Sequence, residues 1–427
     1  MHSFQTAVGV LGGLLVVGAL LSGLARRSFL SLTALFVLVG FLLGPAVFDV
    51  LHFDPRSNFV DELATVALIV ILFRDGLEVD AEMLQTAWAP PLRKLALGMP
   101  ITAGIVALGT HVLTDLNWTQ SFLVGALLSP TDPILSSSVV TNPRVPRLVR
   151  HSLNLESGLN DGLALPAVLA FAAALDLSEP DFTWWTYVLQ DIGVGLLYGV
   201  AIGLLASVVL PRGSGLDDKM PAHQRSLYAL GVAFGTYALT VAPPHGNGFI
   251  SVFVCAIVVG IRRPDLRYYY AQRAEEIVEI VKLGVFVLFG SLLTFHGLFG
   301  DGWAAVGIVA VTLLIARPVA VFASLTGTRL PVYVRAFMAW FGPKGVATMA
   351  FGLLVLARDI PDDDRIFNIV ALTVFCSIFA HGLSDSPGVD WIARRAERER
   401  RAMRAAEPGP ARWETSTPPG FDAPDGS

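Results

Sequence analysis

The sequence predicts an all-α polytopic membrane protein with about 13 transmembrane helices, and three observations support this fold class. Of the 427 residues, 54% are hydrophobic and only 15% are charged. The mean hydropathy of +0.62 is well above that of soluble domains. Apolar runs of about 20 residues, the length that crosses a bilayer as a helix, recur along the chain.

The apolar runs divide the chain into 13 expected spans. No basic segment precedes the first run, which passes through Arg26 and Arg27 into the second, so it is predicted to be a span and not a cleaved signal peptide. Residues 1–390 form the predicted transmembrane domain, and residues 391–427 form a short, largely disordered tail. The spans lie at about 5–24, 28–48, 60–77, 92–113, 119–140, 151–174, 184–210, 226–242, 248–261, 276–296, 302–325, 332–357 and 365–384.

The distribution of Lys and Arg predicts the orientation of these spans. Loops after odd-numbered spans hold 16 of the 30 basic residues, with Arg93 and Lys94 counted among them. Loops after even-numbered spans hold three, namely Arg56, Arg358 and Arg365. Because cytoplasmic loops carry the excess of Lys and Arg, we expect the N-terminus outside the cell (inner) membrane and the C-terminus in the cytoplasm.

An odd number of spans is typical of an inverted-topology secondary transporter. Two six-helix repeats, at about 1–175 and 226–390, would be joined by span 7 and enter the membrane from opposite sides. Span 7 has glycines at positions 195, 199 and 203, a spacing that predicts close helix packing.

Prolines interrupt two spans that correspond in the proposed repeats. Span 5 contains Thr-Asp-Pro at 131–133, and span 12 contains Gly-Pro-Lys-Gly at 342–345. Proline removes an amide hydrogen and disfavours helix in the residue before it. Ordinary proline kinks are the alternative, but the charges of Asp132 and Lys344 favour a binding site. We therefore expect crossed broken helices at a midplane site.

Span 6 carries polar side chains within an otherwise apolar run. Glu156, Asn160 and Asp161 project to one broad face of a helix, with Ser157 beside them. Desolvation disfavours a buried carboxylate anion, so such a group binds a proton or a metal cation in competition. That competition is the chemistry of antiport, and a structural ion pair is the alternative for an isolated carboxylate.

Buried charges require partners, and few cations lie within the spans. Lys344 is the expected partner of Glu156, which leaves Asp161 to titrate. Arg317, in span 11, is expected to hold the broken backbone or Asp132.

In combination, these motifs resemble cation/proton antiporter family 1, which contains bacterial NhaP-type sodium/proton antiporters and animal sodium/proton exchangers. The resemblance covers nearly the whole chain. It implies that Asp161 binds H+ and Na+ in turn, with Thr131 and Ser157 completing the oxygen shell. It also implies that Asn160 supports the site and that exchange is electroneutral, since electrogenic relatives carry a second Asp there. A homodimer is implied as well.

Two positions depart from the family pattern. Lys344 stands where the family usually has arginine, so its implied pair with Glu156 has fewer fixed hydrogen bonds. At the end of span 3, Arg74 occupies a position that is acidic in many relatives, and Asp75 follows it. Asp75 is interpreted as a solvated loop carboxylate in preference to a cation ligand.

The expected function is secondary active antiport of Na+ or Li+ against H+ by alternating access. The sequence has no P-loop, HExxH or GxSxG motif, so ATP-driven transport and common intramembrane hydrolysis lack their signatures. We expect no enzyme activity, no cofactor and no nucleic-acid partner, only cations, protons and lipid. The alternatives are a K+/H+ antiporter, a passively conducting gated channel, and an intramembrane enzyme with Glu156 and Asp161 as acid and base.

Overall fold

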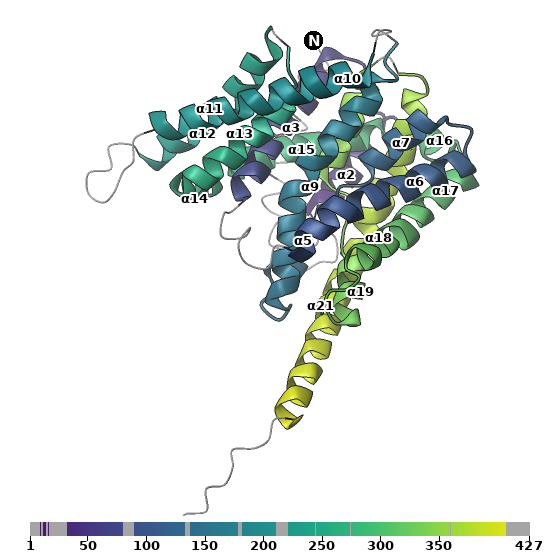
Figure 1. Ribbon diagram of the computed structural model, residues 1–427. Coiled ribbons are helices and arrows are strands. Elements are labelled where there is room, and N and C mark those ends of the chain that lie inside the picture. The colour runs from purple at the N-terminus through teal and green to yellow at the C-terminus, as the bar shows by residue number, and fades with distance from the viewer. Residues whose placement is uncertain are drawn as a thin grey trace, which may run out of the picture.

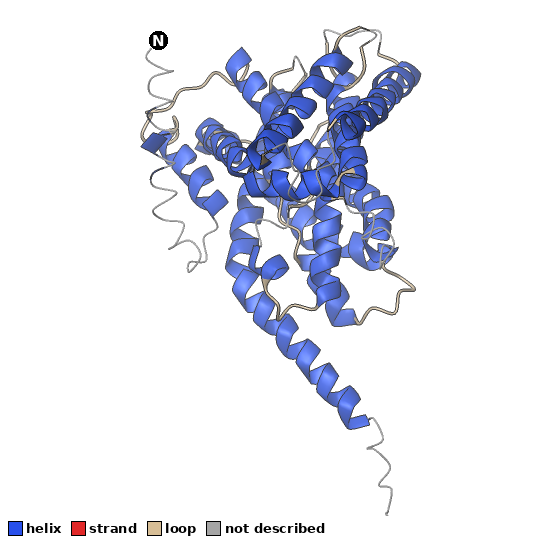
Figure 2. Cartoon of the chain, turned by 90° about the vertical axis from the view of Figure 1, so that its left-hand side faces the viewer, coloured by secondary structure: helices blue, strands red, loops and turns tan. Residues whose placement is uncertain are grey.

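The computed structural model describes residues 9, 12–13, 16, 32–79, 89–132, 137–177, 182–210, 221–243, 245–273, 275–358 and 360–406. Within these ranges every regular element is a helix. The helices pack into one body, from which the end of the last helix projects (Figures 1 and 2). The predicted fold class is confirmed.

The helices of the first half follow the predicted spans closely. The first predicted span, at 5–24, lies outside the described residues apart from isolated positions. The others are α2 (Leu32–Leu43), α3 (Asn58–Glu78), α5 (Ala89–Arg93) continuing through the π-helical turn η1 (Lys94–Gly98) into α6 (Met99–Leu113), α7 (Trp118–Leu127), α8 (Ser137–Thr141) and α9 (Arg147–Ala173). Span 7 is α10 (Trp184–Thr186), η3 (Tyr187–Val194) and α11 (Gly195–Val209).

The second half repeats this agreement. Its elements are α12 (Ala222–Val241), α13 (Gly248–Arg262), α14 (Pro264–Arg273), α15 (Glu275–Leu292), α16 (Phe295–Phe299), α17 (Trp303–Ala310) with η5 (Val311–Ala316) and α18 (Arg317–Ser324), α19 (Val332–Trp340), α20 (Val346–Leu356) and α21 (Asp363–Ala406).

Four helices of the described chain are long and apolar enough to cross a bilayer by themselves: Ala89–Leu113, Trp184–Val209, Trp303–Ser324 and Asp363–Glu399. Among the other predicted spans, α3, α9, α12 and α15 are continuous helices with a more polar composition, while α2 and α13 are shorter apolar helices. Spans 5 and 12 are divided into pairs of half-helices, α7 with α8 and α19 with α20, as their prolines predict.

The core of the body lies around α3 and α20. Every residue of α20 is buried, as is the stretch of α3 from Ala67 to Phe73. These two stretches are therefore enclosed by other helices, whereas the apolar helix Trp184–Val209 is largely exposed at the surface of the body. The predicted close approach of span 7 is also present, because a Cβ at Gly199 would lie 2.7 Å from the carbonyl oxygen of Ser251 on α13.

The last helix is longer than the predicted span at 365–384, and residue 390 is not a helix end. Alanine, arginine and glutamate after Asp390 are strong helix formers, so the basic run continues α21 through Ala406. Glu397 pairs with Arg401 one turn later, and Glu399 accepts a hydrogen bond from Tyr333 on α19. Residues 407–427 of the predicted disordered tail lie outside the described residues.

Candidate ion-binding site

The two broken helices meet at their breaks. The backbone nitrogen of Asp132, beyond the end of α7, donates a hydrogen bond of 2.8 Å to the carbonyl oxygen of Pro343. Between α19 and α20, residues 341–345 are likewise non-helical. Lys344 reaches back from this segment, and its Nζ donates to the carbonyl oxygen of Pro130 at 3.2 Å. Backbone groups freed by one break are thus satisfied by the other, as buried backbone in a membrane requires.

Glycine is required where the two segments touch. A Cβ at Gly345 would lie 2.0 Å from the Cβ of Asp132, and a Cβ at Gly342 would lie 2.0 Å from the guanidinium carbon of Arg317. The glycines that flank Pro343 and Lys344 therefore leave room for the Arg317 side chain and for the opposing break.

Replacing Gly345 by alanine is expected to separate the two breaks, because backbone must shift to accommodate the new Cβ. We expect a lower thermal midpoint of the purified protein in detergent and a loss of transport. Gly352→Ala is the matched control on the same helix, since its Cβ would meet Phe367 at an ordinary 3.6 Å. Equal thermal midpoints for the two variants would contradict the close contact between Gly345 and Asp132.

Glu156 lies between two cations, and they are not the expected ones. Its Oε2 accepts from Lys94 Nζ at 2.5 Å, and its Oε1 accepts from Arg317 Nη1 at 3.0 Å. Lys344, the predicted partner, instead holds the carbonyl of Pro130. The predicted Glu156–Lys344 ion pair is therefore wrong, because the break carries the Lys344 ammonium towards the end of α7.

Lys94 is the site residue that sequence reasoning missed. The Lys and Arg distribution counts it as a loop residue. In the structure, the helix formed by α5, η1 and α6 begins at Ala89 and carries the Lys94 side chain inward, where it is 1% exposed. A signal was present, since Lys94 lies two residues inside the predicted span that begins at residue 92. A lysine can occupy this depth because Glu156 compensates its charge.

Arg317 joins this ion pair to the broken helix. Its Nη2 donates to the carbonyl oxygens of Met338 at 3.2 Å and Phe341 at 2.9 Å, at the end of α19. Those carbonyls lack intrahelical partners because the helix stops at Trp340. A guanidinium suits this position, since its fixed donors can serve a carboxylate and two carbonyls at once.

Two side chains of α21 complete the support of this break. Ser377 Oγ accepts a hydrogen bond of 2.9 Å from the backbone nitrogen of Lys344. The ring nitrogens of His381 lie 2.7 Å from the carbonyl oxygen of Ser377 and 2.9 Å from that of Trp340. Sequence reasoning did not single out this pair, although a four-residue spacing places both side chains on one helix face.

Asn160 connects span 6 to the break in span 5. Its Nδ2 donates to the carbonyl oxygen of Thr131 at 2.6 Å and lies 3.0 Å from the Thr131 hydroxyl. Its Oδ1 is buried and has no hydrogen-bond partner among the described residues. A buried acceptor without a donor is costly, so this oxygen is available to a cation or a water molecule.

Asp161 lies on α9 next to Asn160 and is 5% exposed. Within the described ranges, its carboxylate has no hydrogen bond or ion pair. The carboxylates of Asp75 and Asp132 repel it, and the cations Arg74 and Lys282 attract it. Ser157, half-buried, precedes Asp161 by one turn on the same face.

Asp75 is not the solvated loop carboxylate that the sequence suggested. It lies within α3, is 2% exposed, and accepts from Arg74 Nη2 at 2.5 Å. α3 packs against α9 here, because a Cβ at Gly158 would lie 3.6 Å from the Asp75 carbonyl oxygen. The interpretation is wrong because α9 packs against the last turns of α3, which places Asp75 inside the protein.

Two groups of charges with different properties therefore lie along α9. Around Glu156, the carboxylate is bound by two cations and fixed in place. Around Asp161, the carboxylate is buried, and the preceding residue Asn160 contacts the Thr131 hydroxyl. Asp75 and Asp132 add negative charge there. Such an oxygen-rich position can accept either a proton or a hard monovalent cation.

Comparison with known proteins agrees with this architecture. A family model described as "Sodium/hydrogen exchanger, transmembrane" matches residues 13–391. The fold is similar to that of the sodium proton antiporter MjNhaP1 from Methanocaldococcus jannaschii, with a TM-score of 0.78 at 18% identity, covering 92% of this chain and 98% of that one.

Sequence relatives include antiporters named for different cations. The chain is 26% identical over 405 residues to the K(+)/H(+) antiporter NhaP of Alkalimonas amylolytica, covering 93% of this chain and 69% of that protein. It spans 65% of the K(+)/H(+) antiporter NhaP2 of Shewanella oneidensis, at 27% identity over 88% of this chain. It is 26% identical to the Na(+)/H(+) antiporter NhaP of Pseudomonas aeruginosa, over 78% of this chain and 81% of that protein. The match of the family model over most of its length places the chain in the sodium/hydrogen exchanger family of transmembrane proteins.

Proposed function

We propose that this multi-pass membrane protein exchanges a monovalent cation for H+ by alternating access, with Asp161 binding each in turn. One observation carries the proposal: Asp161 is buried where two broken helices cross and has no ion-pair or hydrogen-bond partner in the described chain. A carboxylate at this depth needs a positive charge or a proton, and the described residues give Asp161 no ion pair.

The neighbouring groups have separate tasks in this scheme. When Asp161 is ionised, its carboxylate binds the cation, and Thr131, Ser157 and the unpaired Asn160 Oδ1 complete the oxygen shell. Asp132 adds negative charge at the break. When protons bind Asp161, its attraction for the cation is lost and the cation leaves.

The ion pairs of Glu156 remain fixed during this cycle. Lys94 and Arg317 neutralise Glu156, so this carboxylate does not compete for the transported ion. Because Asn160 contributes an amide and not a second carboxylate, one cation exchanges for one proton and the cycle is electroneutral.

Na+ or Li+ is the first candidate for the cation, and K+ is the second. The observation that favours K+ is that the relatives from Alkalimonas and Shewanella are named K(+)/H(+) antiporters. This chain spans about two thirds of their length, and the Pseudomonas relative that it covers more fully is named for Na+. Selectivity depends on cavity size and on the number of oxygen ligands.

The remaining assignments belong to the same proposal. The protein is placed in the cell (inner) membrane with its N-terminus outside and its C-terminus in the cytoplasm, following its Lys and Arg distribution. It acts as a homodimer without an enzyme activity or a resident cofactor. Cross-linking in native membranes tests the dimer, and single-cysteine labelling of the two termini tests the orientation.

Reconstitution into liposomes with an imposed pH gradient tests the exchange. Addition of Na+, Li+ or K+ is expected to dissipate the gradient, and clamping the membrane potential should leave the rate unchanged. On acidification below the range in which the carboxylate ionises, the apparent cation affinity should weaken by about tenfold per pH unit, because each proton bound displaces one cation. Flux that is independent of the proton gradient, or single-channel currents, would support a channel instead.

A further inference from the structure

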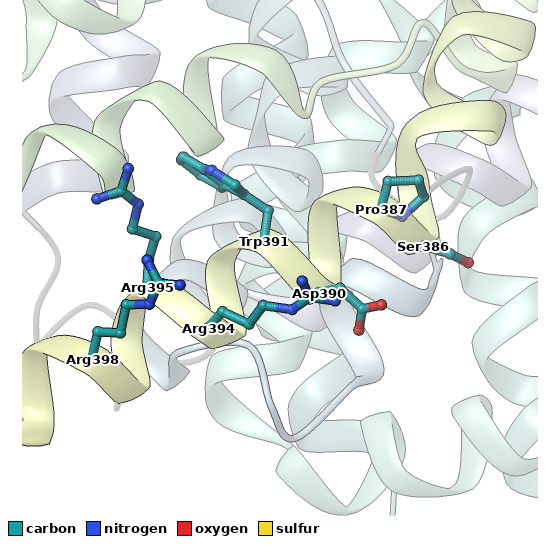
Figure 3. A pocket seen from close by; sticks show the side chains of 7 residues that line it. All are labelled: Ser386, Pro387, Asp390, Trp391, Arg394, Arg395 and Arg398. Carbon is teal, nitrogen blue, oxygen red and sulfur yellow. The ribbon is translucent and has the colours of Figure 1, made fainter.

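An open groove lies beside α21 where this helix leaves the helical body. Its volume is about 640 Å³, and its lining includes Ser386, Trp391 and three arginines, Arg394, Arg395 and Arg398. Figure 3 shows these side chains on one stretch of the helix, with Arg395 extending to the same side as Trp391.

The rotation of α21 at this groove is fixed by its opposite face. Ile392 and Ala396 are buried, and Glu399, one turn further, is hydrogen-bonded to Tyr333 on α19. At the rim of the groove, the ring of Trp391 is nearly parallel to that of Phe337, with the ring centroids 6.4 Å apart. The arginine face therefore points out of the body.

One carboxylate, that of Asp390, also lines the groove, and Glu397 lies on the same stretch of helix, but both are paired with other cations. Asp390 pairs with Arg144 at 2.7 Å, and Glu397 pairs with Arg401. The guanidinium groups of the three groove arginines have no ion pair within the described part of the chain, and all three side chains are exposed. The groove thus carries a positive charge that the described residues do not compensate, on a helix whose rotation is fixed by its packing.

The position of the groove along α21 matches the depth of a membrane surface. From Asp363 to Trp391 the helix rises about 42 Å at 1.5 Å per residue, and a bilayer including its headgroups is about 40–45 Å thick. Trp391 is thus one bilayer thickness from Asp363 along the helix, a separation that matches the opposite headgroup layer, in which tryptophan is enriched. Arginines one and two turns further can reach back to the same layer.

We propose that this groove binds the phosphate headgroup of an anionic phospholipid of the predicted cytoplasmic leaflet. Guanidinium groups bind phosphate through paired hydrogen bonds, and basic residues next to a span attract anionic lipids. The Ser386 hydroxyl adds a donor, and the indole of Trp391 covers the glycerol and upper acyl region. The headgroup depth favours a lipid over a soluble phosphate or over the acidic segment that follows residue 406.

Quenching of Trp391 fluorescence by brominated lipids tests the proposal on the full-length protein. Nanodiscs would contain brominated phosphatidylglycerol or brominated phosphatidylcholine at equal mole fraction, and the Trp391 signal is obtained by subtracting that of Trp391→Phe. We expect at least twofold stronger quenching by the anionic lipid. The triple variant R394Q/R395Q/R398Q should lose this preference, whereas Arg401→Gln, on the same helix but outside the groove, should keep it.

Two checks keep the result interpretable. If the triple variant is poorly folded, Arg394→Gln and the charge-preserving Arg394→Lys are measured, and Arg394→Gln should weaken the preference more, because it removes the charge as well as the paired hydrogen bonds. Equal quenching by the two lipids would overturn the proposal. Loss of the preference on adding inorganic phosphate at constant ionic strength would also overturn it, because the occupant would then be a soluble anion. A preference that appears only after neutralising Glu407 and Glu414 would indicate that the segment after residue 406 occupies the groove, which overturns the proposal as well. The readout does not depend on cation exchange, so its failure and that of the proposed function are distinguishable.

Discussion

Asp161→Asn is expected to reduce cation-dependent proton flux to the level of empty liposomes while leaving the protein folded. The amide cannot release a proton or supply the anionic charge that binds the cation. Because the described chain provides Asp161 with no ion pair, its removal leaves no buried cation without a partner, so stability should be kept. Proton flux and the thermal midpoint are both measured, the second in detergent.

The matched control for this variant is Asp364→Asn. Asp364 lies at the far end of α21, its side chain is 65% exposed, and its contact with Arg56 is 3.4 Å long. An exposed pair of this kind contributes little, so both flux and thermal midpoint should be unchanged. Residual cation-dependent exchange by Asp161→Asn would remove this residue from the centre of the proposed mechanism.

Glu156→Gln is expected to damage folding before it affects ion binding. The substitution leaves Lys94 and Arg317 buried without their carboxylate, and breaking a buried ion pair costs about 3–5 kcal/mol. We expect a low yield of monodisperse protein and a lower thermal midpoint, measured by size-exclusion chromatography after heating.

A pair of double-mutant cycles identifies the partner of Glu156. Combining Glu156→Gln with Lys94→Met should restore part of the lost thermal midpoint, because both members of the 2.5 Å pair are then neutral. Combining it with Lys344→Met should give smaller coupling, since Lys344 bonds to a carbonyl of the other break. Larger coupling with Lys344 than with Lys94 would restore the pairing that the sequence suggested.

The breaks in spans 5 and 12 were predictable because their causes are local. A proline cannot donate a backbone hydrogen bond, and this holds wherever the residue lies in the fold. The parity of the spans then indicated that the two breaks meet, and the hydrogen bond between Asp132 and Pro343 joins them.

The ion-pair partners were not predictable from the same information. Different packings of the helices would pair Glu156 with different cations. Choosing among these cations requires knowing how each helix is rotated and how deep each side chain lies. Lys94 became the partner because α5 and η1 carry it inward as one helix. Asp75 was misplaced for a related reason, since the packing of α9 against the end of α3 determines whether this carboxylate faces solvent or protein.

The sequence by itself determined the membrane class, the positions of the spans, the two broken helices and the face of span 6 that holds Asp161. These follow from hydrophobicity, proline chemistry and helical periodicity, which act over a few turns. Only the tertiary structure decided that Glu156 is held by Lys94 and Arg317, that Arg74 binds Asp75, and that α21 presents an arginine-lined groove. The ion pairs of Glu156 join residues far apart in the chain. The side on which Arg74 and Asp75 meet, and the face that α21 exposes, depend on how each helix is rotated against its neighbours.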